Sequence, residues 1–222
     1  MEENVNYFDF LYEKIQKHLE NEKKGLPSVS IIARENPSPY RILASTIISL
    51  RTKDSVTLSS SRRLFEKADS FESLLQLDEK EIKDAIYPAA FYTRKAENLK
   101  EIAKIVVENY NGKLPDEMDE LMALPGVGIK SASLVLNLAF EKSAICVDCH
   151  VHQIVNRLGI VSTKSPEESE KELRKKVPEK YWISLNELFV SFGQTTCLPV
   201  SPYCSKCPIE STCPKIGVGK SR

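Results

Sequence analysis

A short glycine-rich stretch followed by a lysine combines residue types that could bind an anion and carry out chemistry. The sequence LPGVG over 124–128 precedes Lys130. Glycines allow a tight turn and a close approach of the backbone to a ligand, and the helix that apolar spacing predicts after them would add unpaired N–H groups. Gly126 and Gly128 are therefore candidate anion-binding residues, and Lys130 could contact the anion or act on it. The plain alternative is a turn before a surface lysine, since short glycine motifs recur by chance.

Asp148 stands where the N-cap of a further helix is expected. Val151, Ile154, Val155 and Leu158 follow it at helical spacing, and aspartate is among the preferred N-cap residues. A carboxylate at this point could cap the helix, take part in chemistry, or do both.

Four of the six cysteines lie close to the end of the chain, as Cys197-x6-Cys204-x2-Cys207-x5-Cys213. This proline-containing stretch has too few apolar residues to fold unaided, and the intracellular character of the chain favours metal over disulfides. Zinc and iron–sulfur clusters both accept four thiolates. One Cys-x2-Cys pair with a single cysteine on each side favours a [4Fe–4S] cluster over zinc.

The other two cysteines, Cys146 and Cys149, are expected in the core, because free cysteine is among the most buried residue types. A catalytic Cys149–His150 pair is disfavoured, since adjacent residues on a helix do not face each other. The same argument weakens a metal pair formed by His150 and His152.

Composition narrows the class of protein. The chain has 222 residues, of which 41% are hydrophobic and 28% charged, which is typical of a globular protein. No apolar run approaches the ~18 residues of a membrane span, and the acidic, amphipathic N-terminus does not resemble a signal peptide, so we expect a cytoplasmic protein without membrane contact. The 31 basic residues balance 31 acidic ones, so nucleic acid could be bound only through a local basic face.

Apolar periodicity is helical nearly throughout, and no segment shows sustained strand alternation. The pattern predicts an all-α protein of about ten helices joined by short loops. The expected helices cover 8–19, 40–50, a stretch from Asp54, 71–77, 79–86, 96–110, 115–121, the stretches after Gly128 and Asp148, a stretch from Pro166, and 185–193.

Together these features make the chain resemble the endonuclease III branch of the helix-hairpin-helix DNA glycosylases over nearly its whole length. The resemblance is carried by LPGVGIK at 124–130, VDCH at 147–150, Asn156-Arg157 and the cysteine spacing. Weaker support comes from KAEN at 95–98 and NGKLP at 111–115. No single motif would be specific, but the combination is.

The resemblance implies two α-helical domains that flank a DNA-binding cleft. Residues 30–140 would form a six-helix domain bearing the hairpin, and residues 1–29 with 141–222 a domain that holds a [4Fe–4S] cluster on the four cysteines. The implied partner is duplex DNA containing damaged bases or abasic sites, bound by a monomer.

The resemblance also implies the activity: removal of damaged, typically oxidised, pyrimidines followed by strand cleavage. Lys130 would attack the sugar and form a Schiff base, with Asp148 assisting, and β-elimination would cut the strand. Gly126 and Gly128 would hold phosphate, and His150 would orient the Asp148 turn or touch phosphate. Three rivals remain: a monofunctional mismatch glycosylase, a non-catalytic helix-hairpin-helix DNA-binding protein, and a zinc-stapled structural protein.

Two positions depart from the family pattern. Where the family most often fills the gap left by an extruded base with glutamine, this chain has Arg51, and its apolar wedge would be Phe91. Ala90 replaces a common glycine beside that wedge. Arg51 could donate to an orphaned base or bind phosphate, and Phe91 could instead belong to the core.

Overall fold

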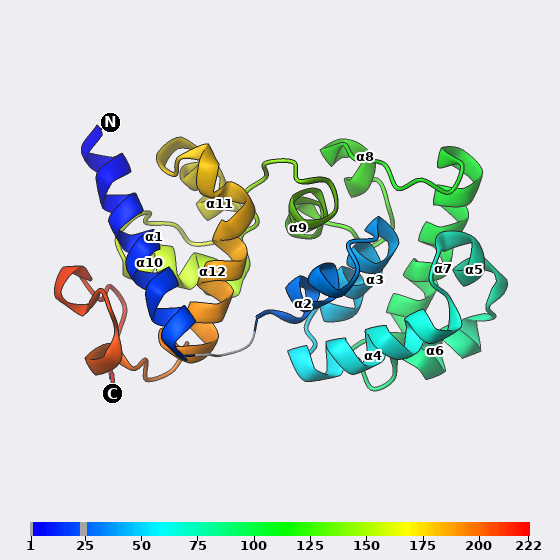
Figure 1. Cartoon of the computed structure of the whole chain (residues 1–222), viewed down its shortest axis with the longest axis horizontal. Coiled ribbons are helices and arrows are strands. Elements are labelled where there is room, and N and C mark those ends of the chain that lie inside the picture. The colour runs from blue at the N-terminus through cyan, green and yellow to red at the C-terminus, as the bar shows by residue number, and fades with distance from the viewer. Residues whose placement is uncertain (1, 23–25) are drawn as a thin grey trace. The chain divides into compact units, whose positions relative to one another are not determined.

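The computed structural model of the chain describes residues 2–22 and 26–222, with side chains from Tyr7 to Asn21 and from Leu26 onward (Figure 1). These residues form twelve α-helices and three short 3-10 helices, and contain no strand. The prediction of an all-α fold is confirmed. The chain divides into two compact units: Pro27–Lys142, and the residues up to Leu26 together with Ser143–Arg222.

The unit Pro27–Lys142 contains eight of the described α-helices, six of them with at least eight residues. They are α2 Ser28–Glu35, α3 Pro39–Ser49, α4 Asp54–Lys67, α5 Phe71–Gln76, α6 Glu79–Ile86, α7 Tyr92–Tyr110, α8 Met118–Met122 and α9 Ile129–Phe140.

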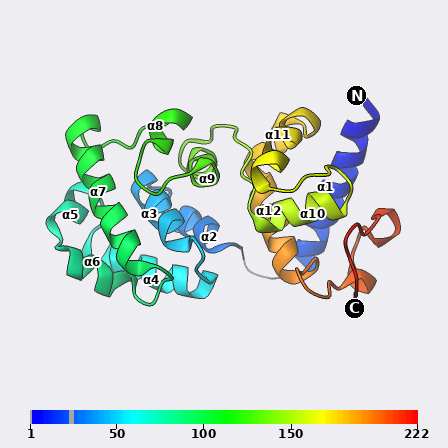
Figure 2. The ribbon, with the colours of Figure 1, turned by 180° about the vertical axis from the view of Figure 1, so that it is seen from behind.

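Helix α3 lies at the centre of this unit and contacts α2, α4, α7 and α9 (Figure 2). Ile42, Leu43, Ile47 and Ile48 are completely buried, which the apolar sequence of this stretch predicts. Burial of a large aliphatic side chain stabilises the fold by roughly 1.5–3 kcal/mol. The central helix therefore fixes the turn that follows Ser49 and provides the surface against which α9 packs.

The other unit consists of the first helix and the last part of the chain. Its elements are α1 Glu2–Glu22, α10 Cys149–Arg157, α11 Pro166–Lys176, η1 Glu179–Tyr181, α12 Trp182–Thr195, η2 Cys204–Lys206 and η3 Glu210–Thr212.

Its core lies between α1, α10 and α12, where Leu11, Ile154 and Phe189 are buried. Polar contacts tie α1 to the C-terminal part: the Tyr12 hydroxyl donates to Ser184 Oγ at 2.6 Å, and the His18 ring is 2.8 Å from Thr196 Oγ1. The Cys197, Cys207 and Cys213 side chains pack against the same core. The cysteine-bearing tail thus belongs to this unit.

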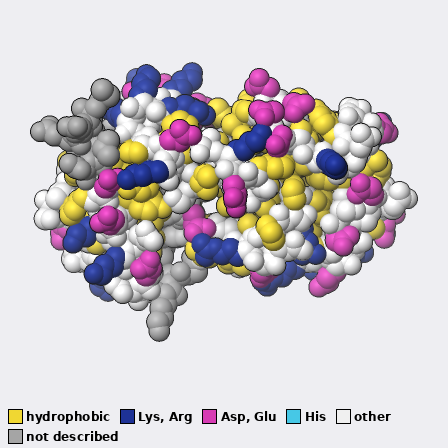
Figure 3. Space-filling model, turned by 45° about the horizontal axis from the view of Figure 1, so that its top comes forward, with side chains coloured by type: hydrophobic (Ala, Val, Ile, Leu, Met, Phe, Trp, Pro, Cys, Tyr) yellow, Lys and Arg dark blue, Asp and Glu magenta, His cyan; other side chains and the backbone are white. Residues whose placement is uncertain are grey.

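None of the described helices is long and apolar enough to cross a membrane. Basic and acidic side chains are interspersed over the face shown in Figure 3.

Candidate functional site

Two glycines in the hairpin between α8 and α9 have different roles. Gly126 has a backbone conformation and surroundings that exclude a side chain, whereas Gly128 leaves the backbone open to a ligand. Gly126 has φ +75, and a Cβ there would lie 2.3 Å from Asn98 Nδ2 of α7. The turn is closed by the Val127 N–H, which donates to the Leu124 carbonyl at 3.1 Å. Gly128 is exposed, has φ −100, and would meet no described atom within 4 Å of an added Cβ. A ligand can therefore approach the backbone closely at Gly128.

Helix α9 begins directly at this open position. Gly128 is its N-cap and supplies no side-chain hydrogen bond to the first turn, so that turn keeps the partial positive charge of a helix N-terminus. Lys130 is the second residue of α9 and is half-buried. Because Ala132 and Val135 are buried in the same helix, the position of Lys130 beside the hairpin is fixed by packing.

Asp148 is the N-cap of α10, as its spacing predicts. Its Oδ1 accepts a hydrogen bond from the Val151 N–H at 2.9 Å. Val151, Ile154 and Val155 are fully buried along the same helix. The carboxylate is half-buried and is held at the start of a helix whose direction the core determines.

The residues next to Asp148 differ in their surroundings. His150 lies against Gly193 of α12, where a Cβ would be only 2.5 Å from its Nδ1, and that buried Nδ1 has no hydrogen-bond partner among the described residues. Cys146 is buried, which confirms its expected place in the core. The same expectation for Cys149 is wrong: it is exposed, because the first residue of α10 projects away from the apolar stripe that begins at Val151.

His152 is not part of a metal pair. Its Nδ1 lies 2.7 Å from Ser169 Oγ of α11, so it joins α10 to α11. No group of three His, Cys, Asp or Glu side chains among the described residues converges closely enough to hold a single metal ion.

The structure brings Arg51 and Phe91 together. Both have left-handed backbone, with φ 55 and φ 56, and the Arg51 guanidinium lies 5.7 Å from the centre of the Phe91 ring. Phe91 is 64% exposed, so the alternative that it belongs to the core is wrong. An exposed aromatic ring beside a guanidinium is a surface able to stack on bases and to contact phosphate.

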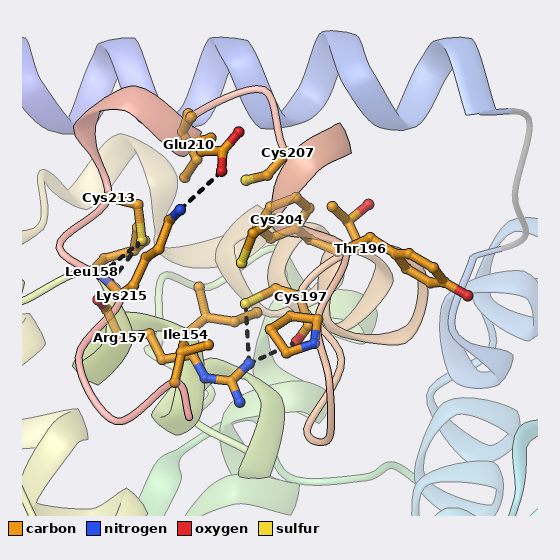
Figure 4. Close-up of a pocket in the computed structure, with 15 residues that line it drawn as sticks. Ile154, Arg157, Leu158, Thr196, Cys197, Cys204, Cys207, Glu210, Cys213 and Lys215 are labelled. Atoms are coloured by element: carbon orange, nitrogen blue, oxygen red, sulfur yellow. Dashed lines mark hydrogen bonds and ion pairs between the residues drawn. The ribbon is translucent and has the colours of Figure 1, made fainter. Parts of the chain in front are cut away.

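The four clustered cysteines line one recess (Figure 4). With the solvent at its mouth included, its volume is about 420 Å³, and Ile154, Leu158 and Phe192 form apolar parts of its wall. The Lys215 N–H donates to Cys213 Sγ at 3.4 Å. Hydrogen bonds of this kind tune the sulfur ligands of iron–sulfur clusters.

The Arg157 side chain holds one wall of this recess through hydrogen bonds to the segment that begins at Cys197. The Asn156-Arg157 motif did not predict this role. Its guanidinium donates to Cys197 Sγ at 3.4 Å and to the Leu198 and Pro199 carbonyls at 2.8 Å each. Its side chain is almost fully buried, with 8% of the residue exposed. The sequence signal for this role of Arg157 is weak: it is a basic residue at the end of an apolar helix face, ahead of a polar tail.

Burial raises the pKa of the Cys197, Cys207 and Cys213 thiols in the recess. This is the first cause of the raised pKa of Cys197 and Cys213, and it brings the pKa of Cys207 to about 11, while Arg157 opposes the rise at Cys197. Four thiolates in such a place need compensating positive charge, which bound metal supplies. The donor set therefore fits a metal centre coordinated by four sulfurs.

Comparison with known proteins assigns the family. The family model described as the HhH-GPD superfamily base excision DNA repair protein matches residues 44–179, which include the hairpin, Lys130 and Asp148. The chain belongs to this superfamily. Within it, endonuclease III of Thermotoga maritima is 43% identical over 175 residues, which are 79% of this chain and 82% of that enzyme.

Solved structures agree with this assignment. Endonuclease III trapped as a covalent intermediate with DNA matches with a TM-score of 0.83 and 29% identity over 95% of each chain. A thermostable thymine-DNA glycosylase matches with a TM-score of 0.79 and 26% identity, over 92% of this chain and 94% of that one. As a member of the endonuclease III branch of the HhH-GPD superfamily, the chain is a DNA glycosylase and AP lyase of base excision repair.

Proposed function

We propose that this enzyme removes oxidised pyrimidines from duplex DNA as a monomer, with Lys130 as the nucleophile and Asp148 as its catalytic partner. The observation that carries the proposal is the local geometry of Lys130: it stands in the first turn of α9, directly after a hairpin whose Gly128 leaves open space over an uncapped helix N-terminus. Such a terminus binds phosphate, so the same element that holds the strand also presents the amine.

The chemistry proceeds in two stages on one sugar. The neutral amine of Lys130 attacks C1′, the bond from C1′ to the base breaks, and the base leaves with that electron pair and takes up a proton. The nitrogen then loses a proton and forms a double bond to C1′, while the bond from C1′ to O4′ breaks and O4′ takes up a proton, which gives the protonated Schiff base. This Schiff base acidifies the C2′ proton; loss of that proton breaks the bond from C3′ to its oxygen, so the 3′ phosphate leaves and the strand is cut. Asp148 stabilises the positive charge that develops on the sugar.

Two parts of the protein contact the DNA in this proposal: backbone N–H groups of the hairpin, and side chains that enter the space left by the extruded base. The N–H groups around Gly126 and Gly128 hold phosphate, which fixes position without reading sequence. Arg51 and Phe91 occupy the space that the extruded base leaves, and extrusion costs less for a damaged base than for an intact one. His150 orients the turn that carries Asp148.

A borohydride trapping experiment tests the role of Lys130. Reduction during turnover on duplex DNA with an abasic site or an oxidised pyrimidine should yield a covalent protein–DNA complex with the wild-type enzyme. Lys130→Ala should form none. Lys175→Ala is the matched control, because Lys175 makes a surface pair with Glu172 on α11 that contributes little to stability. Trapping that persists in Lys130→Ala would place the nucleophile elsewhere.

The same experiment separates the principal rival. The similarity to a thymine-DNA glycosylase supports a monofunctional mismatch enzyme as the second candidate. Such an enzyme releases a mismatched thymine without a Schiff base, so base release without trapping by the wild type would favour it.

We also assign a [4Fe–4S] cluster to Cys197, Cys204, Cys207 and Cys213. All four thiols face one recess, and the spacing Cys197-x6-Cys204-x2-Cys207-x5-Cys213 favours this cluster over a single zinc ion. When bound, the cluster would order the tail that carries these cysteines; the cleavage chemistry above uses none of its electrons.

A further inference from the structure

A buried lysine joins the two loops that carry Arg51 and Phe91. Lys95, in the first turn of α7, is only 5% exposed. Its Nζ donates to the Ile48 and Leu50 carbonyls at 2.6 Å each and to Thr52 Oγ1 at 2.9 Å. These three acceptors lie at the end of α3 and in the turn through Arg51, so one ammonium group closes that turn.

Thr52 extends the connection to the second loop. Its Oγ1 accepts a hydrogen bond from the Ala90 N–H at 3.1 Å as well as the one from Lys95. Ala90 directly precedes Phe91, so a single hydroxyl links the Arg51 turn to the loop that ends in Phe91.

The far end of the second loop is anchored from α4. The Arg63 side chain donates through Nε to the Ala85 carbonyl at 2.9 Å, and through Nη2 both to the Tyr87 carbonyl and to Ser60 Oγ, the latter at 3.1 Å. The segment between Tyr87 and Phe91 is therefore held at both ends.

Both loop tips are strained and need this support. Arg51 and Phe91 have left-handed backbone, which costs an L-residue free energy and persists only where the surroundings impose it. Because the two strained residues also face each other, with the guanidinium over the ring, a shift of either loop would separate them.

We propose that Lys95 is a positioning residue that couples the two loops through Thr52, so that Arg51 and Phe91 enter the duplex together as one two-part wedge. This inference rests on the proposed function, since it concerns how the enzyme fills the gap left by the extruded base. Lys95 itself acts only through these loops, because its amine is occupied by the three oxygens that it holds.

Lys100 provides a matched control on the same helix. Its Nζ donates to the Leu75 carbonyl at 2.6 Å and to the Leu77 carbonyl, so it closes the end of α5 as Lys95 closes the end of α3. It touches neither the Arg51 turn nor the Tyr87–Phe91 loop. Lys95→Met and Lys100→Met thus remove the same kind of interaction, and only the first affects the wedge.

The first measurement is the ratio of affinities for duplex DNA with a tetrahydrofuran abasic analogue and for the intact duplex. Lys95→Met should lower this ratio about tenfold, the loss expected for one hydrogen bond to a charged group. Lys100→Met should leave it unchanged. An unchanged ratio in a folded Lys95→Met enzyme would overturn the proposal.

The second measurement is a double-mutant cycle of Arg51→Ala and Phe91→Ala, in which the measured quantity is again the ratio of affinities for the abasic-analogue duplex and the intact duplex. Their effects should be non-additive in the wild type and additive in a Lys95→Met background. Thr52→Val should reproduce the loss of coupling and Thr52→Ser should restore it, which keeps the test decisive if Lys95→Met does not fold. Additive effects in the wild type would contradict a coupled wedge.

Trapping on single-stranded abasic DNA separates failure of this inference from failure of the proposed function. No opposite base has to be displaced there, so Lys95→Met should lose much more trapping on duplex than on single-stranded DNA. Equal losses on the two substrates would overturn the positioning role. Absence of trapping in the wild type on either substrate would instead contradict the role of Lys130.

Discussion

At the scale of single residues, Asp148 combines a structural role with a proposed catalytic one. The helix cap is visible, since Oδ1 accepts from the Val151 N–H, whereas the catalytic role is a proposal. The two roles need different properties of the same side chain. The cap needs an acceptor oxygen, which an amide also has, but stabilisation of positive charge needs the carboxylate.

Two substitutions therefore separate the roles. Asp148→Asn should retain stability, because asparagine and aspartate are similar N-caps, whereas Asp148→Ala should cost about 1 kcal/mol. Both should lower the rate of base release by roughly 10²–10³-fold, as the loss of a group that stabilises charge in the transition state does. Urea unfolding and single-turnover base release measure the two effects. Wild-type rates in Asp148→Asn would reduce Asp148 to a cap.

The cap and the cysteines could be inferred from sequence because their signals are local. Asp148 directly precedes an apolar helical pattern, and three short spacings define the four cysteines. Lys95 and Arg157 could not be recognised in this way. Lys95 bonds to residues 43 to 47 positions away, and Arg157 to residues 40 to 42 positions away, so their partners emerge only when the chain is folded.

At the scale of helices, periodicity identified most elements but not all of their ends. The apolar pattern does not predict α2, which is short, follows Pro27 and has no side-chain cap. Helix α8 begins at Met118, later than the expected start at Pro115, and α12 continues to Thr195, past the expected end at Gly193. Gly193 lies inside the helix, where the absence of a side chain leaves room for the His150 ring.

This packing predicts an unusual result for Gly193→Ala. Glycine to alanine inside a helix ordinarily stabilises by roughly 0.5–1 kcal/mol. Here the new Cβ would lie 2.5 Å from His150 Nδ1, so α10 or α12 must shift, and overpacking of this kind costs about 1–3 kcal/mol. We therefore expect Gly193→Ala to lower the free energy of unfolding, as measured by urea denaturation.

Removal of the opposing ring provides the control. In a His150→Ala background the two ring atoms nearest the new Cβ are gone and only the Cβ of residue 150, at 3.0 Å, remains, so Gly193→Ala should be much less destabilising there. A Gly193→Ala protein as stable as the wild type would mean that the contact between α10 and α12 is looser than the structure places it.

At the scale of the whole molecule, the two units differ in what holds them together. The unit Pro27–Lys142 has a complete apolar core around α3. In the tail from Cys197 onward, Ile209 is the large aliphatic side chain that reaches the core, whereas Val200 and Ile216 are 81% and 54% exposed. Burial also raises the pKa of Cys197, Cys207 and Cys213, so we expect the tail to depend on the proposed cluster more than on packing.

Loss of the cluster should therefore unfold the tail and spare the other unit. Cys204→Ser should lower the iron and acid-labile sulfide content and the visible thiolate-to-iron absorbance. Cleavage by a protease within 197–222 should also accelerate about tenfold or more, because the rate of cleavage depends on local opening of the tail. Mass spectrometry of the fragments should find 27–142 still protected. Cys149→Ser, a change at an exposed cysteine outside the recess, should alter neither metal content nor cleavage. Zinc in place of iron in the wild-type protein would contradict the cluster assignment, and a protease-resistant tail in metal-free Cys204→Ser would show that packing alone orders it.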